Sequence, residues 1–144
     1  MATKPRPMMP GSQPAANANE RPNKAPEFFA RLLNAVTVAH ALHFQQTGPG
    51  SYARHQALGK LYEDLNERID SLVDDWQGCH DTIIADYPFA PIEKPADPVA
   101  FIEELYKYVE TARADVSDES HIQNQIDEIC TLISTTRYKL KRLA

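Results

Sequence analysis

Four stretches of the sequence repeat apolar residues at intervals of three and four, and this spacing constrains the fold more than any other feature. A repeat of this kind places apolar side chains on one face of an α-helix, whereas a half-buried strand requires strict alternation. The pattern predicts an all-α protein with helices at about 27–46, 51–78, 98–115 and 118–142.

The same spacing predicts which side chains form the buried face of each helix. They are Phe29, Leu33, Val36, His40 and His43 in the first helix; Tyr52, His55, Leu58, Tyr62, Leu65, Ile69, Leu72, Val73 and Trp76 in the second; Phe101, Leu105, Tyr108, Val109 and Ala112 in the third; and Ile122, Ile126, Ile129, Ile133 and Leu140 in the fourth.

Residues at the ends of these stretches are typical helix starts and stops. Pro26 suits the first position of a helix, and Gly48 and Pro49 interrupt the first stretch. Side chains that can accept a hydrogen bond from a free backbone amide stand before three of the helices, and we expect them to act as caps. They are Ser51, Asp97 and the run Ser117-Asp118-Glu119.

The connection over residues 79–97 is unusually long for a compact domain. It contains Pro88, Pro91 and Pro95, so we expect it to be largely non-helical. A long connection is needed if the chain must travel the length of the bundle before the third helix begins. The sequence therefore predicts a ferritin-like four-helix bundle with one long crossover.

Residues 1–25 differ in composition from the rest of the chain. They contain five prolines and almost no large apolar side chains, and four basic residues stand against the single acid Glu20. This leaves a charge of about +3 on the segment and about −8 on the remainder. We expect residues 1–25 to form a disordered tail and residues 26–144 to form one domain.

The compartment is indicated by what the sequence lacks. Cys79 and Cys130 are far apart and outside any metal-binding spacing, which favours a reducing environment over a disulfide framework. No apolar run approaches the length of a membrane span, and no signal-peptide segment begins the chain. The expected localisation is cytoplasmic.

Two histidines and two aspartates form the candidate metal-binding set. His43 precedes the first turn by about as many residues as His55 follows it, so both should lie at one height of the helical hairpin. Asp70 and Asp74 lie one turn apart on the second helix. That helix separates Asp70 from His55 by about 22 Å, so the four side chains can meet only if a second, antiparallel copy lies alongside.

The residues from His40 to Asp75 resemble the ferroxidase segment of the Dps-type miniferritins. That segment is similar to H-x-x-H-W, a glycine, an aromatic residue, a second histidine, Leu-Tyr and then D-x-x-x-E-R. The matching residues here are His40-Ala41-Leu42-His43-Phe44, Gly48, Tyr52, His55, Leu61-Tyr62 and Asp70-Ser71-Leu72-Val73-Asp74-Asp75.

The resemblance implies that His43 and His55 of one subunit, with Asp70 and Asp74 of its partner, bind Fe(II) and pass its electrons to peroxide or dioxygen. The protein would then be a ferroxidase that detoxifies and stores iron, in a homo-oligomer built on a two-fold dimer and extending to twelve subunits. The ligand types also allow zinc or manganese. His40 is interpreted as a packing residue.

Three departures from the motif leave a second class of function open. Phe44 stands where the motif has tryptophan, Asp74 where it has glutamate and Asp75 where it has arginine. The alternative is a catalytically degenerate bundle that acts as an interaction or scaffold protein, of a kind that a phage could encode. The basic tail, through Lys4 and Arg6 among others, is a candidate DNA-binding segment because lysine and arginine neutralise phosphates.

Overall fold

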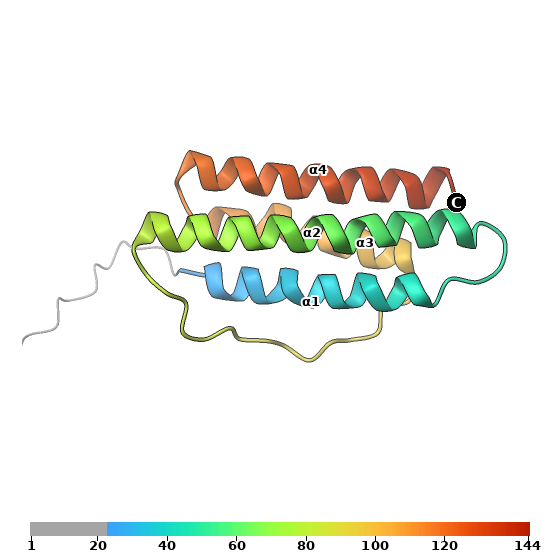
Figure 1. Cartoon of the computed structure of the whole chain (residues 1–144), viewed down its shortest axis with the longest axis horizontal. Coiled ribbons are helices and arrows are strands. Elements are labelled where there is room, and N and C mark those ends of the chain that lie inside the picture. The colour runs from blue at the N-terminus through green and yellow to red at the C-terminus, as the bar shows by residue number, and fades with distance from the viewer. Residues whose placement is uncertain (1–22) are drawn as a thin grey trace, which may run out of the picture.

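The computed structural model describes residues 23–144, and this part of the chain contains helices and no strand. The elements are α1 (Ala25–Phe44), α2 (Ser51–His80), α3 (Pro98–Ala112), the short 3₁₀ helix η1 (Arg113–Asp115) and α4 (Ser120–Arg142), shown in Figure 1. The all-α prediction is confirmed. The expected tail lies outside the described residues except for its last three positions.

The helices form a four-membered ring in which every neighbour is antiparallel. Helix α1 packs on α2, α2 on α4, α4 on α3 and α3 on α1, so α2 and α3 are diagonal (Figure 1). Residues 81–97 run along the outer side of α1 and return the chain to the start of α3, where the Asn34 amide donates to the Ala90 carbonyl at 3.0 Å. The predicted four-helix bundle with one long crossover is confirmed.

The observed N-terminal cap agrees with the predicted one in α3 and differs from it in other helices. Asp97 caps α3 by accepting a hydrogen bond from the Ala100 amide at 2.8 Å, as expected. Ser51 was expected to cap α2 but is its first residue, because Gly50 takes the cap position at φ 75°. A positive φ favours glycine, which explains why a glycine stands immediately before the first residue of α2.

Two other boundaries differ from the prediction. The hydroxyl of Ser117 accepts from the Glu119 amide and closes a local turn, so α4 begins at Ser120 with no side-chain cap. Helix α1 begins at Ala25, inside the segment that was predicted to be disordered, and Ala25 is fully buried. The Asn23 side chain accepts a hydrogen bond from the Ala25 amide at 3.0 Å and so supports this start.

The buried face of α1 lies one residue away from the predicted one. Leu33, Val36, His40 and His43 are only half-buried and border the groove between α1 and α2. The reason is that α1 packs against α3 as well as α2, and small alanines on the inward face allow that contact. The residues of α1 that are buried are Ala25, Phe28, Phe29, Ala30, Leu32, Ala35, Ala39 and Leu42.

In the other helices the predicted faces mostly hold. All five expected residues of α4 are buried. On α2, Tyr52 is 76 % exposed and was wrongly assigned to the core, while the fully buried Leu61 was missed. Trp76 closes one end of the core, where its Nε1 donates to the Val116 carbonyl at 3.0 Å. No helix within residues 23–144 is both long and apolar enough to span a bilayer.

Candidate metal centre

The structure brings His43 and His55 together at the turn end of the α1–α2 hairpin. His43 lies in the last turn of α1 and His55 in the second turn of α2. Their imidazole rings stack with centroids 3.6 Å apart and planes inclined by 22°. Both side chains are half-buried.

Each imidazole is held by the backbone of the other histidine. His43 Nδ1 donates to the His55 carbonyl at 2.8 Å, and His55 Nδ1 donates to the His43 carbonyl at 2.9 Å. A carbonyl oxygen only accepts, so both Nδ1 atoms carry hydrogen. When the rings are neutral, both Nε2 atoms therefore hold a lone pair, and no hydrogen bond within residues 23–144 uses it.

This arrangement fits the requirements of a metal ligand. A histidine that binds a metal through one nitrogen usually donates its other N–H to a carbonyl or carboxylate, which fixes the ring and its tautomer. The hydrogen bond from His55 also satisfies the His43 carbonyl, which lies in the last turn of α1 and lacks a helical partner. The two hydrogen bonds that join α1 to α2 therefore also fix the orientation of two donor atoms, Nε2 of His43 and Nε2 of His55.

Gly59 is a site residue that the sequence reasoning missed. It lies on α2 one turn after His55, and a Cβ atom there would stand 3.1 Å from Cε1 and 3.2 Å from Nδ1 of His43. That is closer than ordinary van der Waals contact, so a side chain at this position would displace the imidazole. A glycine inside a well-formed helix was the available signal, because it weakens the helix unless close packing requires it.

His40 packs between aromatic rings on the same surface. Its imidazole stacks on Tyr62 with centroids 4.0 Å apart and on Phe44 at 4.7 Å. Its centroid is 6.2 Å from that of His43. These contacts agree with the interpretation of His40 as a packing residue, although its ring is half-buried and not in the core.

The structure does not bring Asp70 and Asp74 to the histidines of the same chain. Helix α2 is continuous from Ser51 to His80, so Asp70 lies about 22 Å along the axis from His55. Both carboxylates are exposed and have no hydrogen bond or ion pair within residues 23–144. In this part of the chain no three histidine, cysteine or acidic side chains converge in a metal-binding arrangement.

Asp75, the departure from the arginine of the motif, faces a different direction from Asp74. Its carboxylate accepts a hydrogen bond from the Gln125 amide of α4. Asp75 therefore lies on the side of α2 that packs against α4, whereas Asp70 and Asp74 lie on the outer face. Within one chain Asp75 links α2 to α4.

Comparison with known proteins assigns the sequence to a family. Residues 43–140 match the model of a family of unknown function, DUF5856. The chain belongs to this family. The matched segment begins at His43 and includes His55, Asp70 and Asp74, and it extends through most of α4.

A protein of bacteriophage T4 shows similarity over most of its length. It is an uncharacterized 14.6 kDa protein of Enterobacteria phage T4 from the mobD–ri intergenic region, and it is 24 % identical over 120 residues. The similarity covers 83 % of this chain and 90 % of the phage protein. No solved structure matches the chain.

Proposed function

We propose that this protein is a Dps-like, ferritin-like iron protein that binds Fe(II) between two subunits and oxidises it with peroxide or dioxygen, thereby detoxifying and storing iron. One observation carries the proposal: His43 and His55 hold two Nε2 donors at one end of the hairpin, and two carboxylates that have no partner within residues 23–144 stand at the other end. Imidazole and carboxylate together suit ferrous iron, and they also suit zinc and manganese.

The second copy supplies the missing half of each site. An antiparallel neighbour lays its carboxylate end against the imidazole end of the first chain, so a two-fold axis creates two equivalent sites. The partner's Asp70 and the partner's Asp74 then lie beside His43 and His55. Because the two rings stack 3.6 Å apart, one of them has to turn before both Nε2 lone pairs can point at one ion. The exposure of Asp70 and Asp74 and their lack of partners among the described residues leave both carboxylates available for this role.

Iron is the substrate in this reaction. Two ferrous ions give one electron each to a peroxide molecule, whose O–O bond breaks, and two protons complete two water molecules. The chain's own part is to hold ferrous iron through nitrogen and oxygen donors. The hydrogen bonds to the two imidazoles fix the orientation of the rings and therefore the direction of their donor nitrogens. The shorter side chain of Asp74 reaches about one methylene less far than the glutamate of the motif.

Anaerobic titration with Fe(II), followed by addition of peroxide, tests this function. The parent protein should oxidise iron in proportion to its number of sites, and His43→Ala and Asp70→Ala should lose most of that capacity. Glu104→Gln, which removes an exposed charge from α3, is the control and should behave like the parent. Equal oxidation by all four proteins would show that these residues do not form the site.

A scaffold function remains the second proposal, and the exposure of Phe44 supports it. This ring is 72 % exposed at the end of α1, where the miniferritin motif has tryptophan, and Tyr52 in the first turn of α2 is 76 % exposed. Exposed aromatic side chains favour an interaction surface. The proline-rich segment that would recruit a partner lies in residues 1–22, outside the described residues.

DNA association is proposed for the basic segment 1–25, whose Lys24 is described and exposed. Retention on duplex DNA should fall steeply with added salt and should disappear when residues 1–22 are removed. Retention that does not depend on the segment would assign DNA binding to another part of the surface.

A further inference from the structure

One end of the bundle joins two segments that lack acidic residues. Residues 28–62, which include the α1–α2 turn, and residues 129–144, which include the last part of α4, contain no aspartate and no glutamate. The two segments meet, because a Cβ atom on Gly50 would stand 2.8 Å from the backbone of Ala144. All 20 acidic residues therefore lie elsewhere in a chain whose net charge is −5.

Lysine and arginine side chains gather at this end from two neighbouring helices, α2 and α4. Arg68 of α2 pairs with Glu128 of α4 at 2.6 Å, and equally many residues separate Arg68 from Arg54 and Glu128 from Arg142. Because the two helices are antiparallel, Arg54 and Arg142 lie at one height. The lysines and arginines in the first two turns of α2 and the last two turns of α4 form the cationic end; they are Arg54, Arg137, Lys139, Lys141 and Arg142.

The acidic side chain that reaches the cationic end from α3 is Glu103. It pairs with Arg137 at 3.5 Å and with Lys141 at 2.9 Å. Glu104, the next residue of α3, is exposed and has no ion pair within residues 23–144. Even when both glutamates are counted, two carboxylates stand against five cations, so the positive charge is reduced but not cancelled.

The other three cations have no acidic partner among the described residues. Arg54 donates to the Gln46 side-chain oxygen and to a backbone carbonyl of the turn, and both acceptors are uncharged. Lys139 and Arg142 have no hydrogen bond or ion pair from their side chains within residues 23–144. The end of a helix carries only about half an elementary charge, so the dipole of α4 offsets a small part of this excess.

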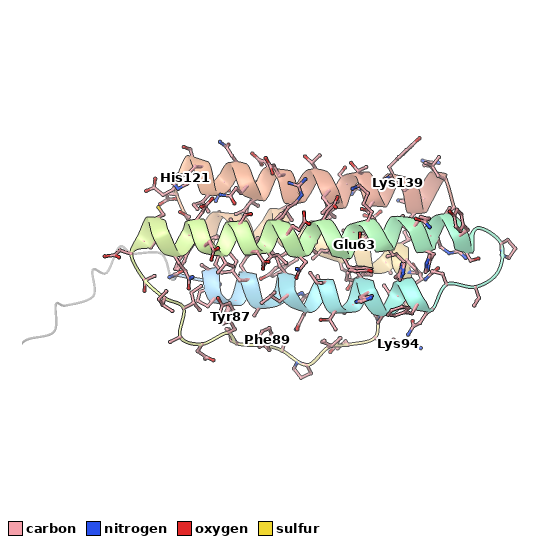
Figure 2. The ribbon with its side chains drawn as sticks, in the orientation of Figure 1. Glu63, Tyr87, Phe89, Lys94, His121 and Lys139 are labelled. Atoms are coloured by element: carbon pink, nitrogen blue, oxygen red, sulfur yellow. The ribbon has the colours of Figure 1, made fainter. Side chains whose placement is uncertain are left out.

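Exposed aromatic rings accompany these cations. Tyr138 is 56 % exposed and lies one turn before Arg142, on the same face of α4. Tyr52, in the first turn of α2, is 76 % exposed. Figure 2 labels Lys139 on α4, near the end of this helix. Surfaces that bind single-stranded nucleic acids combine these two components, because cations contact the phosphates and aromatic rings stack on the bases.

We infer that the cationic end, together with Tyr138, binds single-stranded nucleic acid, independently of any metal. Duplex DNA keeps its bases stacked on one another, so it would use the cations but leave the tyrosine ring without a partner. A membrane surface favours several bulky apolar side chains on one face, whereas the last turn of α4 and the residue after it expose one, Leu143. The aromatic and cationic side chains together therefore favour an unpaired strand.

Fluorescence anisotropy with a labelled oligothymidylate of about 15 nucleotides tests the inference on the full-length chain, in the presence of a chelator and at several salt concentrations. The logarithm of the affinity should fall linearly with the logarithm of the salt concentration. The double variant Lys139→Gln with Arg142→Gln should reduce that slope by about 1.4, because each phosphate contact to a single strand contributes about 0.7. Tyr138→Ala should weaken binding about fivefold or more without changing the slope.

The matched control removes two exposed lysines from other surfaces, Lys94 of the crossover and Lys107 of α3. Figure 2 shows Lys94 below α1 and Lys139 on α4, on opposite sides of the bundle. The double variant Lys94→Gln with Lys107→Gln loses the same charge as the test variant and should bind the oligonucleotide like the parent.

Three results would overturn the inference. Equal affinities and slopes for the parent and the Lys139→Gln, Arg142→Gln variant would assign the binding to another part of the chain. Equally tight binding of a duplex of the same length, with no loss in Tyr138→Ala, would remove the role of stacking. Binding to phosphatidylglycerol vesicles without binding to the oligonucleotide would make the cationic end a membrane-contacting surface.

Discussion

At the scale of single residues, the candidate site depends on where two imidazole N–H groups point. The sequence predicted that His43 and His55 would lie at one height, because both flank the same short turn at similar distances. It did not predict the reciprocal hydrogen bonds to carbonyls, since these depend on the rotation of each helix about its own axis. Gly59 was missed for the same reason: the close approach of His43 to α2 is a property of packing.

The tautomer of both histidines is the first residue-scale prediction. At alkaline pH, where imidazoles are neutral, long-range ¹H–¹⁵N NMR should show His43 and His55 with hydrogen on Nδ1, because each Nδ1 faces a carbonyl at 2.8–2.9 Å. His40 should lack this signature, since no carbonyl of residues 23–144 accepts from its ring. Finding hydrogen on Nε2 of either histidine would contradict the proposed donor arrangement.

Gly59→Ala should separate the metal site from the stability of the bundle. Alanine favours a helix over glycine by about 1 kcal/mol, which offsets part of the cost of moving the His43 ring, so the thermal midpoint should change little. The new methyl group would press on the His43 ring, so Mn(II) affinity should fall about tenfold or more. Gly78→Ala, where a Cβ meets no atom, is the matched control, and equal affinities would rule out this packing role.

The two cysteines should differ in reactivity toward a thiol reagent. Burial, together with the Glu110 carboxylate that accepts from its Sγ, raises the pKa of Cys130 to about 12. The thiolate is the reactive form, so at pH 8 this side chain should stay unmodified. Cys79 is exposed and should react. Mass spectrometry should find one adduct on the native chain and two after denaturation.

At the scale of elements, the chain encodes its helices more clearly than their orientations. Periodicity placed all four helices within a few residues, because apolar spacing and prolines act locally. The inward face of α1 was wrong by one position, because contacts with α3 rotate the helix so that alanines point inward. Similarly, Ser51 and Ser117 have side chains that can cap a helix, but the turns before α2 and α4 place Gly50 and Glu119 at the cap positions.

The contact between α2 and the end of η1 provides an element-scale prediction. Trp76→Phe keeps an aromatic ring against Phe29 but leaves the Val116 carbonyl without its buried donor, so unfolding free energy should fall by about 1–2 kcal/mol. Trp76→Ala should cost about 3–5 kcal/mol because it also empties the core. Urea denaturation would measure both, and an unchanged unfolding free energy in Trp76→Phe would mean that the hydrogen bond contributes nothing.

At the scale of the whole molecule, one chain contains both halves of the proposed site but cannot join them. This conclusion was available from the sequence, because an uninterrupted helix fixes the separation of its residues. The structure confirms that α2 has no break between Tyr62 and Asp70. The subunit arrangement is a property of surfaces in contact and could not be predicted from a local pattern, so the dimer and any larger shell remain proposals.

Complementation between two inactive variants tests the shared site most directly. One variant carries His43→Ala and His55→Ala, and the other carries Asp70→Ala and Asp74→Ala. Neither variant alone should bind Mn(II) or oxidise Fe(II). In a heterodimer the intact carboxylates of the first meet the intact histidines of the second, so one of its two sites is complete.

The measurement is Mn(II) bound per chain after the two variants are mixed in equal amounts and allowed to exchange subunits. Random pairing makes half of the dimers mixed, so binding should recover to about one quarter of the parent's value. A mixture that binds no more metal than its separate components would contradict a site built from two copies of this chain.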